Sequence, residues 1–356
     1  MERDRTTSFF VAIIDNLIWV IVIVAFVVFS LLSSRFFTLF NLVNILPRVA
    51  ALGLLVIGQS FTMTTAHFDL SSESTLGLTA MVGALFVATT SYGGLGIMLP
   101  PGFAIVFMIL LGLLIGSLNG FMITKLRMNN LVATIAMLIL LRGVVWILSP
   151  GKSVSFLGPV FDWIGGGVLF TIQAGGRPTG VPVSFFFVLV AFALAHLVTR
   201  YTRFGRDMYA IGSNREAAEA TGIRTQRVIF FVYVISGACA GIAGLLEAGR
   251  GDSVVGGLGQ GWIFQVQAAA IIGGISLFGG RGSMVGALGG VLFWGILDSG
   301  LSIMKASPYS FNVFRGGLLL VAMMLDALKT RYMRSLSARQ LFSRSTIGIT
   351  DLHNLG

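Results

Sequence analysis

Residues 200–227 read RYTRFGRDMYAIGSNREAAEATGIRTQR and separate two long apolar runs. Within this basic stretch, Ser213 and Glu216 form an S-x-x-E pattern that is typical of a helix N-terminus, because the hydroxyl caps backbone N–H groups and the carboxylate bonds back to the chain. Strong helix formers follow, and Gly222 supplies a stop. The pattern predicts a helix of about two turns, too short to be stable alone. We therefore expect this helix to be a docking surface for another protein.

The composition is that of an integral membrane protein. Of the 356 residues, 55% are hydrophobic and 11% are charged, whereas soluble domains carry about 25% charged residues. The single cysteine, Cys239, lies in an apolar run, so the chain has no disulfide framework. The net charge of +10 does not indicate a nucleic-acid partner, because loop arginines in a membrane protein usually report its orientation.

Hydropathy predicts an all-α fold of about ten transmembrane helices, each near the ~20 residues that cross the hydrocarbon core of a bilayer. The first apolar run is too long for a signal-peptide core, contains Asp15 and has no clear cleavage site, so we expect it to be retained. The predicted spans are Val11–Leu32, Val49–Ala66, Thr75–Ser91, Phe103–Thr124, Leu131–Leu148, Val183–Thr199, Val228–Ala248, Trp262–Phe278, Met284–Met304 and Asn312–Leu328.

The distribution of positive charge predicts that both termini are cytoplasmic. With ten spans and the N-terminus inside, most of the 24 lysines and arginines fall in inner segments, as the positive-inside rule requires. We therefore divide the chain into a cytoplasmic tail (1–10), a transmembrane domain (11–328) and a basic cytoplasmic tail (329–356).

The longest loop of the predicted transmembrane domain, residues 149–182, lies on the outer side in this topology and is rich in glycine and proline. Two interpretations stay open. A loop of that length is often functional, and here it would meet an external partner. Alternatively, it is a plain connector with a short amphipathic piece around Val160–Ile164.

Glycines recur at helical spacing in several spans, as in Gly112 and Gly116 and again in Gly237, Gly241 and Gly244. Small residues four apart let helix backbones approach closely in lipid, where no hydrophobic effect drives helices together. We interpret these glycines as helix-packing positions.

No catalytic or metal site is indicated. Residues 150–153, PGKS, end like a phosphate-binding loop, but the glycine that the motif needs five residues before Gly151 is Trp146. The three histidines lie far apart in the sequence, without the spacing of metal ligands. We therefore expect no enzyme activity, no cofactor and no metal in this chain.

The ionisable residues Arg142, Glu247, Asp298 and Arg315 fall well inside predicted spans, whereas His196 and Asp326 sit near the inner ends of theirs. Such residues are costly in hydrocarbon and mark functional sites or pairs. Structural pairs are the favoured interpretation, with Asp298 and Arg315 as candidates for a pair across neighbouring spans. A proton or sodium relay is the alternative.

Residues 67–74, HFDLSSES, join the second and third spans without any Lys or Arg. Asp69 and Ser71 are suited to capping a helix. The segment is either an ordinary cytoplasmic turn or a break at membrane depth, where irregular backbone is tolerated if it lines a cavity. Both interpretations stay open.

At this point the chain resembles a known family. The E-A-A-x-x-x-G pattern on an inner loop resembles the coupling motif of permease subunits of ABC importers, and more specifically the bacterial ribose/xylose/arabinose-type sugar permeases. The stretches that carry the resemblance are Glu216-Ala217-Ala218 with Gly222, residues 68–71 (FDLS), 116–120 (GSLNG), 131–134 (LVAT) leading to Arg142, 202–206 (TRFGR) and 268–283 (AAAIIGGISLFGGRGS).

The resemblance implies a multi-pass protein of the bacterial inner (cell) membrane, embedded in the lipid bilayer. A cytoplasmic ABC ATPase would drive it, a periplasmic or extracellular binding protein would deliver the solute, and a second permease chain, identical or different, would flank the pathway. The coupling loop is then 200–227. Its contact residues for the ATPase would be Ser213, Glu216, Ala217, Ala218 and Gly222.

A transmembrane domain so poor in charge suits a small neutral solute, most simply a monosaccharide or polyol. The candidate pathway-lining residues are Asp69, Ser71, Asn119, Arg142 and Asp298. The sequence departs from the family where Ser72, Glu73 and Ser74 replace Val-Gly-Ser, and where no acidic residue stands near Ile263–Phe264. These departures bear on the identity of the solute.

Two other classes remain open at this stage. An ion-coupled secondary transporter or facilitator of a small polar solute would use a charge among Glu247, Asp298 and Arg315. A membrane scaffold without transport would explain the basic inner face, but it gives no reason for the E-A-A-x-x-x-G helix.

Overall fold

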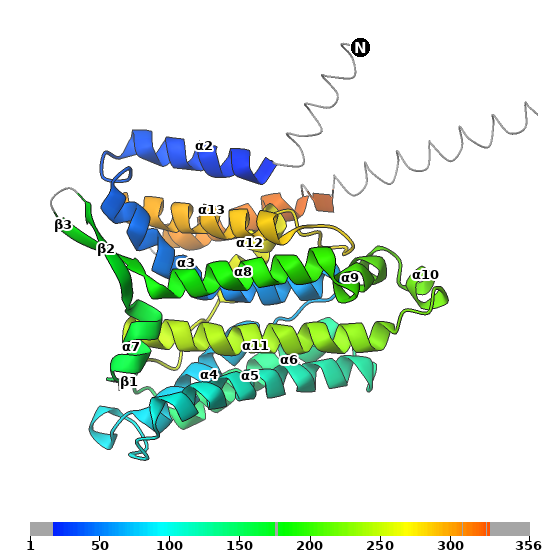
Figure 1. Ribbon diagram of the computed structural model, residues 1–356, viewed down its shortest axis with the longest axis horizontal. Coiled ribbons are helices and arrows are strands. Elements are labelled where there is room, and N and C mark those ends of the chain that lie inside the picture. The colour runs from blue at the N-terminus through cyan, green and yellow to red at the C-terminus, as the bar shows by residue number, and fades with distance from the viewer. Residues whose placement is uncertain (1–16, 175–176, 308, 325, 328–356) are drawn as a thin grey trace, which may run out of the picture.

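A computed structural model describes residues 17–174, 177–307, 309–324 and 326–327, and almost all of its regular structure is helical (Figure 1). The longer helices are α2 (Leu17–Leu32), α3 (Leu39–Thr64), α4 (Ser72–Val87), α5 (Pro101–Thr124), α6 (Asn130–Leu148), α8 (Val183–Tyr201), α11 (Thr225–Gly251), α12 (Trp262–Ile272), α13 (Met284–Ile303) and a last helix over Tyr309–Met324. Short elements are η1 (Thr90–Tyr92), α7 (Pro159–Gly166), α9 (Arg203–Ser213), α10 (Arg215–Ala220), β1 (Val154–Ser155), β2 (Val168–Ala174), β3 (Arg177–Pro182) and β4 (Ser253–Val254).

Within the described residues, six helices are long and apolar enough to cross a membrane by themselves: α3, α5, α6, α8, α11 and α13. Each predicted span contains one helix, and an all-α membrane fold is confirmed. Four of the helices are shorter than a full crossing, so the count of ten crossings and the location of the termini stay predictions. Predicted-span residues before Leu17 lie outside the described residues.

Two predicted boundaries are wrong for physical reasons. The span expected to begin at Val49 begins at Leu39, because Thr38 caps the helix through Asn41 N–H and the helix continues through Pro47. The span expected to run to Phe278 ends at Ile272, because Gly274 takes a left-handed conformation (φ 88°) that only glycine adopts at little cost. Residues 273–283 consequently form a loop, named here the 273–283 loop.

The loop expected over 149–182 carries regular structure. Its α7 includes the amphipathic piece predicted around Val160–Ile164, β2 and β3 form an antiparallel hairpin, and β1 pairs with β4 through Val154 and Val254. Figure 1 shows α7 and the hairpin at one end of the helical bundle and α10 at the opposite end. We call these the hairpin end and the α10 end.

The centre of the bundle is α11, which packs against α3, α4, α5 and α7. Its contact with α5 depends on Gly112 and Gly116 on one helix and Gly237 and Gly241 on the other, since a Cβ on any of them would press on the facing backbone. The interpretation of these glycines as packing positions is confirmed. Large apolar side chains on the outer faces of α2, α5, α6 and α8 are exposed, as a lipid-facing surface requires.

We expect Gly237→Ala to destabilise the protein, because the added methyl overlaps the carbonyl oxygen of Gly112 and overpacking costs about 1–3 kcal/mol. The midpoint temperature of unfolding in detergent measures the effect. Gly143→Ala on α6 is the matched control, since a Cβ there meets nothing within 4 Å. An unchanged midpoint for Gly237→Ala would contradict the packing assigned to α5 and α11.

Candidate functional site

The helix α10 begins one residue later than the S-x-x-E pattern predicts. Ser213 is the last residue of α9, and the N-cap is Asn214, whose Oδ1 accepts a hydrogen bond of 3.0 Å from Ala217 N–H. The correction has a local cause, because Asn214 takes an extended conformation (φ −160°) between the two helices, whereas Ser213 continues the α9 turn. Glu216 therefore stands inside the first turn and forms no capping box.

The C-terminal end of α10 follows the prediction. Gly222 has φ 85°, its N–H bonds to Glu219 O at 3.0 Å, and Ile223 N–H bonds to Ala218 O at 3.1 Å. This pair of bonds is a Schellman motif, which satisfies the last carbonyls of a helix. Among the predicted coupling residues, Ala218 is buried against the protein, while Ser213, Glu216, Ala217 and Gly222 are exposed.

A network of polar contacts fixes α10 to the start of α11. Arg215 Nε donates to Glu219 Oε1 at 3.0 Å, and Thr225 Oγ1 donates to the same carboxylate at 2.7 Å. The Thr225 hydrogen bond first, and Arg215 second, lower the pKa of Glu219. The carboxylate therefore stays ionised near neutral pH, which leaves Glu216 as the exposed acid of α10 without such a bond in the described structure.

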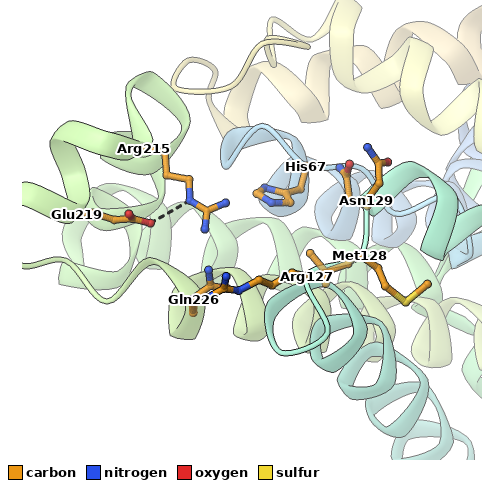
Figure 2. Close-up of a pocket in the computed structure, with 9 residues that line it drawn as sticks. His67, Arg127, Met128, Asn129, Arg215, Glu219 and Gln226 are labelled. Carbon is orange, nitrogen blue, oxygen red and sulfur yellow. Dashed lines mark hydrogen bonds and ion pairs between the residues drawn. The ribbon is translucent and has the colours of Figure 1, made fainter.

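Beside α10 lies a cavity of about 490 Å³, named here the α10 cavity (Figure 2). Figure 2 shows Arg215 from α10, His67 from the segment after α3 and Arg127 from the loop between α5 and α6 facing the same hollow. The His67 ring nitrogen Nδ1 bonds to Thr65 O at 2.7 Å, and burial is the main cause that lowers the pKa of the imidazole. Sequence reasoning did not assign His67 or Arg127, because a lone histidine and a loop arginine carry no motif.

Contacts between α9 and the 273–283 loop connect α10 to the bundle. Tyr209 Oη donates to Gly282 O at 2.9 Å, and Gly280 N–H donates to Thr64 O, at the end of α3, at 2.9 Å. From the other side, Asp326 Oδ2 accepts from Leu277 N–H at 3.0 Å. Hydrogen bonds thus link the loop that follows α12 to α9, to the end of α3 and to Asp326.

Of residues 67–74, Ser72 to Ser74 form the first turn of α4, and the segment before them is half-buried at His67, Phe68 and Leu70 and buried at Asp69 and Ser71. The two interpretations of this segment, a cytoplasmic turn or a break at membrane depth, stay open. Asp69 is 1% exposed, and its carboxylate accepts bonds from Ser71 Oγ at 2.6 Å, Ser71 N–H at 3.0 Å and Ser236 Oγ at 2.7 Å. Asn119 Nδ2 donates to Ser71 Oγ at 2.7 Å. Ser71 is the N-cap of α4, but its hydroxyl points to Asp69 and makes no capping bond, contrary to expectation. The segment thus joins α4, α5 and α11.

A second buried cluster contains Arg142. Its Nη1 donates to Gly256 O at 3.1 Å and to Leu258 O at 2.8 Å, and its Nη2 lies 3.8 Å from Glu73 Oε1. Glu73 Oε2 accepts a bond of 3.0 Å from Ile263 N–H, in the first turn of α12. A carboxylate is favourable at a helix N-terminus. Although no acidic residue stands near Ile263 in the sequence, Glu73 supplies one there.

The predicted pathway residues are therefore brought together only in part. Asn119 donates to Ser71 and Ser71 donates to Asp69, so these three form one chain of hydrogen bonds. Arg142 lies in the neighbouring cluster, which Glu73 joins to the same helix, α4. Asp298 lies apart, where it accepts a 2.8 Å bond from Arg315, so the pair suggested by the sequence is confirmed. Glu247 pairs with Arg250 on α11.

Asp298 and Arg315 line a cavity of about 170 Å³ between α3, α11, α12, α13 and the last helix, named here the tryptophan cavity. Its other lining residues are Arg48, Val49, Leu52, Arg250, Trp262, Gln265, Trp294 and Gly295. Among the described residues, no group of three or more His, Cys, Asp and Glu side chains is placed to hold a metal ion.

The apolar helices, the buried polar clusters and the exposed short helix define a multi-span membrane transport protein. Residues 41–323 match the family described as branched-chain amino acid transport system / permease component, and the chain belongs to this permease family.

Several curated permeases are similar over most of their length. The ribose import permease protein RbsC of Escherichia coli is 33% identical over 318 residues, which are 88% of this chain and 93% of the relative. The galactose/methyl galactoside import permease protein MglC of Salmonella typhimurium is 28% identical (92% and 98%), and the D-allose transport system permease protein AlsC of E. coli is 32% identical (87% and 90%). No solved structure matches the chain significantly.

We expect Arg142→Leu to destabilise the protein by about 3–5 kcal/mol, because it leaves Glu73 buried without its charge partner and also removes the donor to two carbonyl groups. Denaturation in detergent measures the loss. Arg206→Leu is the control at an exposed position of α9 and should change stability by less than ~0.5 kcal/mol. Equal effects of the two substitutions would contradict the structural role assigned to Arg142.

Proposed function

We propose that the chain is the membrane-spanning subunit of an ATP-driven importer for a neutral monosaccharide in the bacterial inner membrane. Family membership gives the class of protein. The names of the similar permeases specify ribose, galactose and methyl galactoside, and D-allose, all of them neutral sugars. ATP binding and hydrolysis then belong to a separate subunit, and an external binding protein delivers the sugar.

The coupling proposal is supported by the structure of α10. This helix is capped at both ends, is fixed to α11 through Glu219 and Thr225, and presents Glu216 and Ala217 to solvent. A six-residue helix is not stable alone, so its rigid attachment fits a part that receives force. We assign its exposed face to the ATPase, with Ala218 as the buried anchor.

The two ends of the bundle support the proposed topology. The α10 end carries the arginines of residues 200–227, and the hairpin end carries α7 and the β2–β3 hairpin (Figure 1). The positive-inside rule then places the α10 end in the cytoplasm with the ATPase. The hairpin end faces outward, where the binding protein docks. A second permease chain packs against exposed apolar helix faces on one side of the bundle and so completes the pathway.

Force from α10 reaches the bundle by a short route in this proposal. It passes through α9 to the 273–283 loop at the Tyr209–Gly282 bond, and from there to α12. The opposite end of α12 is held by Glu73 at Ile263 N–H. Motion of α12 would therefore displace Glu73 and alter the buried cluster that Glu73 forms with Arg142.

We expect Glu216→Lys to abolish co-purification of the permease with its cognate ATPase and to abolish sugar uptake, because it reverses the charge of the exposed acid on α10. Pull-down from detergent and uptake of radiolabelled sugar in cells measure the two effects. Asp162→Lys, the same reversal on α7 at the hairpin end, should leave the ATPase bound. Full ATPase association in Glu216→Lys would contradict the docking surface.

We expect Tyr209→Phe to keep the ATPase bound but to slow uptake by about 3–10-fold, since a net hydrogen bond of about 0.5–1.5 kcal/mol is lost at the contact with the 273–283 loop. The measurement is the initial rate of sugar uptake into proteoliposomes that contain the complete importer. Tyr201→Phe, which alters an exposed tyrosine at the end of α8, is the control. A wild-type uptake rate for Tyr209→Phe would remove this route of transmission.

A further inference from the structure

The tryptophan cavity lies at the hairpin end, away from α10. It is formed by the first half of α3, the last residues of α11, the start of α12 and the second half of α13. Figure 1 shows these parts of the helices on the side of α7 and the hairpin.

The cavity holds polar groups that the protein itself leaves without partners. Gln265 is 8% exposed, and within the described residues its side-chain amide has no hydrogen-bond partner, although it lines the cavity. Its nitrogen and oxygen are not among the fully buried polar atoms that lack a partner, so the amide is accessible from the cavity and can bond a ligand there. Arg48, at the exposed rim, likewise makes no ion pair or hydrogen bond in the described structure.

Two of the three arginines that line the cavity are paired. Arg315 is paired with Asp298, which also lines the cavity, and Arg250 is paired with Glu247, which does not. Arg48 contributes an unpaired charge at the exposed rim. The Asp298–Arg315 pair still offers an acceptor oxygen and free guanidinium N–H donors on adjacent atoms, an arrangement that matches neighbouring hydroxyl groups.

The volume of the cavity and its apolar surface restrict the kind of ligand further. The volume of about 170 Å³ lies below the ~300 Å³ at which pockets for drug-sized ligands begin, so the occupant is small. The indole rings of Trp262 and Trp294 line the cavity, the second of them only 3% exposed. Flat aromatic faces with a few polar groups suit the apolar face of a sugar ring.

We propose that the tryptophan cavity is a binding site for one neutral monosaccharide within a single permease chain. Trp262 and Trp294 contact the ring, Gln265 and the Asp298–Arg315 pair bond its hydroxyl groups, and Arg48 stands at the entrance. The proposal rests on the proposed function, because it takes the solute class from there. It also gives Asp298 a role separate from that of Asp69, Ser71 and Asn119.

The direct test is sugar binding to the purified full chain in lipid nanodiscs. The chain is titrated with D-ribose, D-galactose and D-allose, and binding is monitored by the change in tryptophan fluorescence. We expect a saturable change with at least one of the three sugars and none with the acid D-gluconate. Gln265→Leu and Asp298→Asn should each weaken binding by ~10-fold or more, as the loss of bonds worth about 1.4 kcal/mol requires. Gln226→Leu, at the α10 cavity, should bind the sugar as the unchanged protein does.

Uptake by the complete importer separates the possible failures. If cells accumulate one of these sugars and Gln265→Leu accumulates it at the normal rate, the site is wrong while the proposed function stands. If the complete importer accumulates none of a panel of neutral pentoses and hexoses that includes these three sugars, the proposed function fails. Binding of D-gluconate in preference to the sugars would overturn the neutral class, and loss of binding-protein association in Asp298→Asn with sugar binding intact would reassign the cavity as a docking surface. Gln265→Asn, which keeps the amide, replaces Gln265→Leu if the latter does not fold.

Discussion

The close approach of α5 and α11 is the contact on which the rest of the structure depends. In lipid, helices gain little from burying apolar surface against one another, so backbone contact and polar bonds must hold them. Gly112 and Gly116 lie directly against the backbone of α11 at Gly237 and Gly241. Because α11 also packs on α3, α4 and α7, this single approach sets the distances at which the buried polar groups of those helices meet.

Those polar groups are distributed so that each carboxylate joins different helices. Asp69 connects the segment before α4 to Ser236 on α11, and Glu73 connects α4 to both Arg142 on α6 and the N-terminus of α12. A buried charge is costly unless it is paired and hydrogen-bonded. The helices joined by Asp69 and Glu73 are therefore constrained to shift together and not independently.

The sequence was informative where a pattern acts over short distances. Gly222 as the end of α10, the glycine spacing on α5 and α11, and the Asp298–Arg315 pair were all predicted and are confirmed. The cap of α10 was assigned to Ser213 when Asn214 takes it, because two adjacent residues were both good caps and only the turn between α9 and α10 decides between them. The hydrogen bond that Ile263 N–H donates to Glu73 joins residues 190 positions apart, and no local sequence pattern predicts such a contact. The roles assigned to the coupling and pathway residues remain predictions.

The short pairing of β1 with β4 has a mechanical consequence. Val154 and Ser155 belong to the long loop at the hairpin end, while their partners Val254 and Ser253 open the segment that leads into α12. In that same segment, the carbonyl groups of Gly256 and Leu258 accept hydrogen bonds from Arg142. A displacement of Val154 and Ser155 is therefore transmitted through β4 to the short segment whose carbonyl groups Arg142 bonds, so that the surface loop and the buried arginine are mechanically coupled.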